Sequence, residues 1–360
     1  MGLHHTTKPE KRYPFWYKAS LILIGLSLLV VVMIYGKFIL MPLAFAGFFS
    51  MLLSPVVNWF EKMKLGRAGS IVITLFLLVV LLSGLISLIS VQFVQFAEEI
   101  PVVTERLKGL AQDSRTFAEE TLGFSQEEQF DFLQQGLDTV IERSGQYVSS
   151  FLGATTNVFT ILTLLPIFMF FMLYYKEMYQ TFLRKLFEKK QISSVDDMMV
   201  RVQEVTQNYL VGMLSVVAIL AVLNVTGLLL IGLDHAIFFG VFAALIAVIP
   251  YIGTIIGGLL PTLYAFLFTD SLFTPLAVIG VFAVVQFLEG NIITPRIVGS
   301  KVSINPFMAM IALLIGAEIW GVAGMILFVP LIGILRVIFD QIDDLKPYGY
   351  LLGNKIEYNE

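Results

Sequence analysis

Long apolar stretches are the feature that most constrains this chain. Residues 15–35, broken only by Lys18, and residues 38–60 and 71–96 each exceed the roughly 18 apolar residues that mark a membrane-spanning helix. Charged residues make up only 14% of the chain, whereas soluble domains contain about 25%. Because a soluble core cannot bury so much apolar surface, we predict an all-α, polytopic integral membrane protein.

The charges around these stretches indicate how the chain crosses the membrane. Basic residues flank the first span and fill the short loop after the second, which predicts a cytoplasmic N-terminus by the positive-inside rule. Residues 97–150 hold eleven acidic and four basic side chains, which favours the opposite side. The stretch after Lys18 is too long for a cleavable signal and is followed at once by another span. The predicted simple spans lie at about 15–35, 38–60, 70–96, 151–175 and 209–231.

Two polar segments have helical periodicity. Residues 97–150 are predicted to form two amphipathic helices, with a capping box at Ser125 and Glu128. Residues 176–208 are predicted to form a further amphipathic helix on the cytoplasmic side. Either segment can be a gate or an oligomer contact, or else a solvated connector whose apolar face rests on the spans.

The C-terminal half contains two apolar stretches that are too long for one straight span. Residues 236–268 and 306–338 each comprise 33 residues. A straight helix of that length would measure roughly 50 Å, against a hydrocarbon core of roughly 30 Å. The first stretch is expected to break at Pro250 and the second near Gly321, because proline removes a backbone donor and glycine tolerates unusual conformations. Two short helical hairpins are therefore predicted.

Paired broken helices indicate the substrate site of a transporter, since unwound backbone is tolerated only where it lines a cavity or is buried. A kinked bundle with a purely structural role is the alternative. Around the first break the backbone carbonyls and the Tyr251 hydroxyl can contact a small polar ligand or a cation, although a GxxxG pair also packs helices together. The candidate binding residues of this segment are Pro250, Tyr251, Gly253, Gly257 and Gly258.

Glu318 is the acidic residue that stands out in the second broken stretch. It is far in sequence from any other charge, and a charged group at a helix centre costs at least about 2.5 kcal/mol on insertion scales. Desolvation there would let Glu318 exchange a proton or a sodium ion near neutral pH. The alternative is that the turn between the arms reaches the headgroup region, where Glu318 is simply hydrated.

A polar connector, residues 289–305, follows the ordinary span at 272–288. The candidate ligand or gate residues there are Gln286, Glu289, Asn291 and Arg296. Glu289 and Arg296 can form an ion pair that opens and closes a gate. Alternatively, Arg296 is an ordinary basic anchor at the membrane edge.

Several classes of protein are excluded or disfavoured by what the sequence lacks. There is no cysteine, and the three histidines are His4, His5 and the isolated His235, so neither a thiolate nucleophile nor a metal cluster is expected. No phosphate-binding GxxxxGK[ST] loop occurs. With a net charge of only −4, nucleic-acid binding has little support. We therefore expect no cofactor and no enzymatic activity; an intramembrane protease is the weaker rival.

The C-terminal half resembles the autoinducer-2 exporter family, also called PerM-like permeases. The matching motifs are VIPYIG at 248–253, EGNIITPRIVG at 289–299, INP at 304–306, LIGAEIWG at 314–321 and GMILFVP at 324–330. The resemblance implies a bacterial inner-membrane protein with about eight membrane segments. Members are associated with export of autoinducer-2, and others with exchange of sodium or lithium for protons. Many members have a small residue in place of Glu318, and this departure favours a cation-coupled member.

Together these features predict a gradient-driven transporter of a small solute or monovalent cation, coupled to protons and embedded in the lipid bilayer as a homo-oligomer. A sodium(lithium)/proton antiporter and a non-transporting membrane scaffold are the alternatives. The expected organisation is an N-terminal tail with three spans (1–96), an external insert (97–150), a fourth span with a cytoplasmic helix (151–208), a transport core (209–340) and a cytoplasmic tail (341–360).

Overall fold

The computed structural model describes residues 14–122, 164–186, 192–249, 252–269, 271–299 and 304–353. These residues are almost entirely helical, and their one β contact is an isolated antiparallel bridge between Ile304 and Gly353. Five of their helices are long and apolar enough to cross a membrane, and shorter apolar helices accompany them. The prediction of an all-α, polytopic membrane protein is confirmed.

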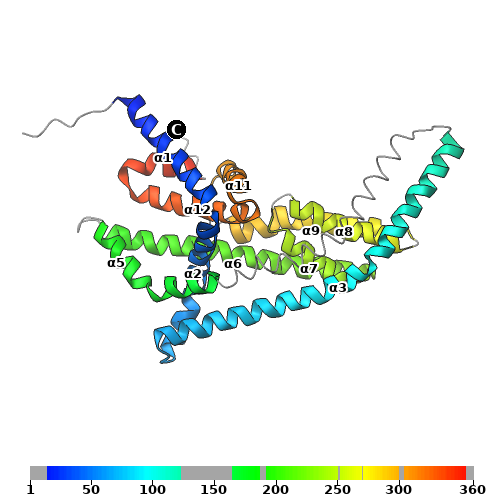
Figure 1. The fold of residues 1–360 in the computed structure, drawn as a ribbon, viewed down its shortest axis with the longest axis horizontal. Coiled ribbons are helices and arrows are strands. Elements are labelled where there is room, and N and C mark those ends of the chain that lie inside the picture. Colours follow the sequence, from blue (N-terminus) through cyan, green and yellow to red (C-terminus); the bar gives the residue numbers. More distant parts are fainter. Residues whose placement is uncertain are drawn as a thin grey trace, which may run out of the picture.

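Three helices form the N-terminal part (Figure 1). α1 (Phe15–Tyr35) and α2 (Lys37–Lys62) are separated only by Gly36, and α3 (Arg67–Leu122) follows after a short turn. The apolar part that could span a membrane is Arg67–Gln92, close to the predicted 70–96, but α3 itself is 56 residues long. It continues as one helix into the acidic segment, because a change from apolar to polar side chains does not interrupt backbone hydrogen bonding. Residues 123–150, which were predicted to hold the second amphipathic helix, lie outside the described residues.

The middle of the chain contains an equally continuous helix. α5 (Lys176–Leu186) follows the apolar helix Leu164–Tyr174, and α6 (Ile192–Ile231) then runs for 40 residues. The predicted amphipathic segment 176–208 is thus divided: its first part is α5, and its second part forms one helix with the predicted fifth span. Contacts from α2, α7, α9 and α12 make α6 the central element of the bundle (Figure 1).

A tight turn reverses the chain after α6. Gly232 has a φ of +77°, its N–H donates to the carbonyl of Leu229, and the N–H of Leu233 donates to the carbonyl of Leu228. This is the hydrogen-bond pattern of a Schellman motif, in which glycine takes the left-handed position. Leu228 and Leu233 are both buried in the same cluster, which is the apolar contact that usually accompanies this motif.

The first hairpin consists of α7 (Ala236–Ile246) and α8 (Ile252–Phe268). The helix breaks where the sequence predicted, between residues 247 and 251. Gly253 and Gly257 lie directly against α7: a Cβ at Gly253 would overlap the carbonyl of Ile246, and one at Gly257 would come within 2.9 Å of the Ala243 Cβ. These two glycines therefore pack the arms of the hairpin together.

α9 (Phe273–Leu288) follows the first hairpin and ends in wide turns. It continues into two π-helical segments, η2 (Glu289–Ile293) and η3 (Pro295–Gly299). The N–H of Thr294 donates to the carbonyl of Glu289, five residues back, and Pro295 has no N–H to donate. The polar connector is thus helical up to Gly299, with a larger radius than an α-helix.

The second hairpin consists of α11 (Pro306–Trp320) and α12 (Val322–Gln341). Asn305 caps α11 by accepting hydrogen bonds from the N–H groups of Phe307 and Met308. Gly321 makes the turn with a φ of +61°, a conformation that other L-residues rarely adopt. A Cβ at Gly324 would overlap the carbonyl of Gly316, so the two arms meet backbone to backbone. Both predicted hairpins are present, but α12 is not a short arm: its 20 residues are long and apolar enough to cross a membrane.

The last described residues lie beside the start of the second hairpin. A short 3-10 turn, η4 (Asp343–Leu345), leads into α13 (Lys346–Leu352). The N–H of Asn305 donates to the carbonyl of Leu352 at 3.0 Å, next to the Ile304–Gly353 bridge. The tip of the hairpin is also fixed, because the indole N–H of Trp320 donates to the carbonyl of Met33 in α1 at 2.9 Å.

Aromatic packing joins the first hairpin to α3. The ring of Phe96 in α3 lies 5.4 Å from those of Phe238 and Phe239 in α7 and 6.1 Å from that of Tyr264 in α8, measured between centroids. Phe239 and Tyr264 are buried in the main apolar cluster of the bundle. The hairpin is consequently held on one side by α3 and on the other by α6 and α9.

Candidate functional site

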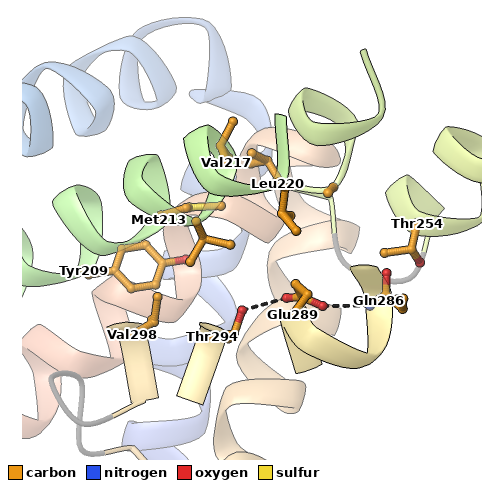
Figure 2. A pocket seen from close by; sticks show the side chains of 12 residues that line it. Tyr209, Met213, Val217, Leu220, Thr254, Gln286, Glu289, Thr294 and Val298 are labelled. Atoms are coloured by element: carbon orange, nitrogen blue, oxygen red, sulfur yellow. Dashed lines mark hydrogen bonds between the residues drawn. The ribbon is translucent and has the colours of Figure 1, made fainter. Parts of the chain in front are cut away.

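A cavity of about 360 Å³ opens between α6, the turn of the first hairpin and the π-helical end of α9. α6 contributes a stripe of side chains at helical spacing, and the hairpin contributes residues on both sides of its turn. Figure 2 shows the polar groups of α9 and the wide turns facing this stripe. The lining residues are Tyr209, Met213, Val216, Val217, Leu220, Ala247, Val248, Thr254, Gln286, Glu289, Thr294 and Val298.

The Glu289 carboxylate is the charged group of the cavity. Its Oε2 accepts a hydrogen bond from the Gln286 side-chain amide at 2.7 Å, and its Oε1 accepts one from the Thr294 hydroxyl at 2.6 Å (Figure 2). These two bonds hold the carboxylate in one orientation at the cavity wall. The cavity therefore presents an oriented carboxylate to its interior.

The π-helical turns explain why these three side chains converge. In a regular α-helix, residues four apart share a face, and Glu289 and Thr294 are five apart. The wider turn brings residues at that spacing over one another, so that the Thr294 hydroxyl meets the Glu289 carboxylate. Pro295, which cannot donate a backbone hydrogen bond, follows at once. Single π turns inside α-helices occur frequently at functional sites.

The structure places the predicted site residues in several environments. Gln286 and Glu289 line the cavity, whereas Asn291 and Arg296 are exposed on the outer side of the turns. The Asn291 side chain donates to the carbonyl of Phe287 in its own helix. The predicted pairing of Glu289 with Arg296 stays a prediction.

The glycines and turn residues predicted to bind ligand in the first hairpin lie in different environments. Gly253 and Gly257 line a small space next to the main cavity, whereas a Cβ at Gly258 would make ordinary contact with Phe282 at 3.4 Å. Pro250 and Tyr251, predicted as flexible backbone and ligand, lie outside the described residues. The ligand roles of these residues stay predictions, while the packing role of Gly253 and Gly257 is visible.

Glu318 lies apart from the cavity. It is exposed in the last turn of α11, three residues before Gly321, and it is not among the residues that line the cavity. The sequence alternative in which Glu318 is accessible at the turn between the arms agrees with this position. Its role as coupling site stays a prediction that the cavity does not support.

Sequence reasoning missed Tyr209 and Thr254 as cavity residues. Tyr209 is buried and begins the α6 stripe, which continues through Met213 and Leu220. A signal was present, because these residues recur every three or four positions. Periodicity alone cannot distinguish a helix face that lines a cavity from one that packs in a core.

A second polar cluster lies where α2, α3 and α5 meet. The Lys176 ammonium donates to the Ser54 hydroxyl at 2.8 Å, and Arg67 donates to the Glu177 carboxylate at 2.6 Å and to the Leu173 carbonyl at 2.9 Å. Burial, and next the nearby Arg67 charge, lower the pKa of Lys176 below its usual value. The cluster borders a separate cavity of about 190 Å³. Since its groups bind one another, we assign it to joining the helices.

The described residues do not form a cluster that could bind a metal ion. No group of three or more His, Cys, Asp or Glu side chains comes together among them. What the described helices supply is one oriented carboxylate, neutral hydrogen-bonding groups and an apolar wall. Such a cavity is suited to hold a small polar solute or a cation.

The described residues contain five helices long and apolar enough to cross a membrane, one of which is an arm of the second hairpin, and a largely apolar cavity that holds a carboxylate. This combination fits a polytopic membrane protein of the transporter class. Comparison of the sequence with known proteins gives the family. The model of the AI-2E family transporter matches residues 21–344, and the chain belongs to this family.

The chain is also similar to individual members of known organisms. It is 28% identical to YrrI of Bacillus subtilis over 315 residues, which covers 84% of this chain and 86% of the relative. It is 24% identical to YhhT of Escherichia coli K12 over 336 residues, or 92% of this chain and 94% of the relative. YueF of Bacillus subtilis is 26% identical over 318 residues, or 83% and 82%. All three names propose a transport role, and none gives a solute.

Proposed function

We propose that this protein is a gradient-driven transporter that carries a small solute or a monovalent cation through the cavity beside Glu289. The observation that carries the proposal is the Glu289 carboxylate, which Gln286 and Thr294 hold at the wall of a cavity inside the helix bundle. An ionisable group within membrane-spanning segments is costly, and such groups usually mark a substrate or ion pathway. Glu289 lies in the apolar span Phe273–Val298.

The backbone around the cavity supports the same proposal. The cavity touches the hairpin turn at Ala247 and Val248 on one side, and the π-helical turns at Glu289 and Thr294 on the other. Irregular backbone at membrane depth is found where it is buried in protein or lines a water-filled space. Binding sites between broken helices of the two halves are a recurring feature of secondary transporters.

The cavity favours particular classes of solute. A fixed carboxylate repels anions and attracts cations or groups that donate hydrogen bonds. The volume of about 360 Å³ admits a molecule of small-metabolite size. Autoinducer-2 is one candidate, because the family is named for it. Sodium is the second, because carboxylate and hydroxyl oxygens, as at Glu289 and Thr294, are the ligands that hard cations prefer.

The placement of the chain in the bacterial inner membrane, with a cytoplasmic N-terminus, completes the proposal. Its support is the concentration of basic residues around the first two spans and of acidic residues in 97–150. Residues 209–340 form the transport core in this arrangement, since they include every cavity-lining residue. Assembly as a homo-oligomer stays a prediction.

The test uses inside-out membrane vesicles that hold a respiration-driven proton gradient, reported by a pH-sensitive dye. Sodium and autoinducer-2 are added in turn, with vesicles from a strain lacking the protein as baseline. We expect one solute to dissipate the gradient only when the protein is present. Replacing the carboxylate, Glu289→Gln, is expected to raise the half-saturating concentration of that solute about 10-fold or more, because a hydrogen bond to a charged group is lost.

The matched control is Glu204→Gln, which makes the same chemical change at an exposed position on α6 outside the cavity lining. It should behave as the unmodified protein does. Unchanged transport in Glu289→Gln would place the solute site elsewhere. If neither solute dissipates the gradient, proton-coupled transport of these two solutes is excluded, and the scaffold alternative gains support.

A further inference from the structure

The cavity continues into a small inner space beyond its α6 wall. This space has a volume of about 20 Å³ and shares Leu220, Ala247, Thr254 and Gln286 with the main cavity. Asn224, which does not line the main cavity, lines this inner space. It lies one helical turn beyond Leu220, so it continues the α6 stripe that begins at Tyr209.

Asn224 is a buried polar residue with an unused acceptor. Its side chain is only 4% exposed, and its Oδ1 accepts no hydrogen bond from any described residue. A buried acceptor without a partner destabilises a protein, and most such groups in native structures bind a ligand or an ordered water. An apolar residue of similar size would fill this position in a membrane helix without that penalty. The amide is therefore a feature that folding alone does not require.

The inner space is shaped to admit one small group. Small residues on the hairpin, Ala243 and Gly257, form the wall opposite α6, and Phe282 and Val285 of α9 form another side. A volume of about 20 Å³ corresponds to roughly one water molecule. A terminal hydroxyl or ammonium group of a solute in the main cavity fits there, whereas a larger group does not.

We infer that Asn224 is a specificity-determining residue of the solute site, and that its Oδ1 accepts a hydrogen bond from a terminal hydroxyl or ammonium group of the bound solute. The inference rests on the proposed function and deepens it by naming the chemical class of solute. Asn224 and Glu289 then recognise the solute from two ends of one connected space, and both accept hydrogen bonds. The solute is consequently a neutral or cationic molecule with donors at separated positions.

The experiment measures binding to the purified full-length protein, through the rise in melting temperature that a bound solute produces. Two matched pairs of probes differ by one terminal donor: erythritol with butane-1,2,3-triol, and ethanolamine with ethanol. We expect the unmodified protein to bind the member with the extra donor about 10-fold more tightly in at least one pair. Asn224→Leu should abolish this preference. The control Asn208→Leu, on the same helix outside the cavity lining, should retain it.

Folding is checked in the same experiment, because leucine has the same branched heavy-atom skeleton as asparagine, with bulkier methyl groups, and favours a helix more strongly. The melting temperature of Asn224→Leu without probe should equal or exceed that of the unmodified protein. Retention of the preference in Asn224→Leu would overturn the inference and assign Asn224 to holding a structural water, while the Glu289→Gln transport defect would leave the proposed function standing. Absence of binding by all four probes, together with normal transport in Asn224→Leu vesicles, would overturn it as well.

Discussion

The two hairpins of the C-terminal half have the same plan and different surroundings. In each, glycines let two short helices approach closely: Gly253 and Gly257 lie against α7 in the first, and Gly316 meets Gly324 in the second. The first hairpin lies against α3, α6 and α9, and its turn borders the cavity. The second lies against α6 and α1, is fixed at Trp320, and exposes Glu318 near its turn. A similar sequence pattern can thus build either a cavity wall or a support.

The difference shows that a broken helix is not by itself a binding site. What distinguishes the first hairpin is its neighbour, the π-helical end of α9, which supplies Gln286, Glu289 and Thr294. The second hairpin has an acidic residue of its own, but Glu318 does not line the cavity that Glu289 borders. The four changes below probe this difference, in order of decreasing expected effect.

The largest effect is expected from Gly324→Ala in the second hairpin. The new methyl group would overlap the backbone carbonyl of Gly316, which cannot move aside as a flexible side chain can. We expect destabilisation by about 3 kcal/mol, measured as unfolding of the purified protein in detergent. Gly280→Ala is the matched control, because a Cβ there meets nothing within 4 Å. Equal stability of the two variants would contradict the close approach of the arms.

A smaller effect on stability is expected from Gly257→Ala in the first hairpin. Its methyl group would come within 2.9 Å of the Ala243 Cβ, a contact that a slight separation of the arms can relieve. We expect a loss of about 1 kcal/mol, together with reduced transport because the arms border the inner space beside the cavity. Transport assays normalised to the amount of folded protein separate the two effects. A variant that loses stability but transports normally would show that the hairpin wall is not part of the pathway.

The two hairpins differ in how the N-terminus of their first helix is capped. Asn305 caps α11 with its side chain, whereas His235, which precedes α7, makes no side-chain cap. Asn305→Ala is expected to cost about 1 kcal/mol, and Asn305→Asp should restore most of it, because aspartate caps as well as asparagine. The free energy of unfolding in detergent checks this. Equal losses in both variants would indicate that the Asn305 side chain stabilises the region through its contact with Leu351 instead.

The smallest effect is expected from Glu318→Gln. Glu318 is exposed and outside the cavity lining, so we expect transport within about two-fold of the unmodified protein at every pH tested. Vesicle assays between about pH 6 and pH 8 measure this directly. A different result would be loss of pH dependence in Glu318→Gln together with normal transport by Glu289→Gln. It would place the coupling site in the second hairpin and not beside the first.

The breaks of both hairpins could be predicted because their causes are local. α7 ends at Ile246 and α8 begins at Ile252, on either side of the predicted break, and Gly321 separates α11 from α12 with a φ of +61°. The ends of α3 and α6 could not be predicted in the same way. Between residues 192 and 231 the side chains change from polar to apolar, but no residue interrupts the helix, so the membrane boundary is not a helix end.

The candidate site was predicted in part, for a similar reason. Gln286 and Glu289 stand out as polar residues at the end of an apolar span, and the structure places both in the cavity wall. Tyr209 and Thr254 reach the same cavity only because α6 and the first hairpin pack against each other. No local pattern encodes that juxtaposition. Tyr209 and Glu289 are far apart in the sequence, and only tertiary contacts bring them to the same cavity.

The length of α6 has a mechanical consequence. Its 40 residues form a rod about 60 Å long, twice the thickness of the hydrocarbon core, and it contains no proline. Near one end, Asp196 is bonded to Arg184 of α5 at 2.7 Å; in its second half, the same rod carries the wall of the cavity. A continuous helix without a kink transmits a tilt at one end to its other end. A force that tilts the α5 end of α6 therefore also tilts Leu220 and Asn224, so the proposed solute site is mechanically coupled to the polar end of this helix.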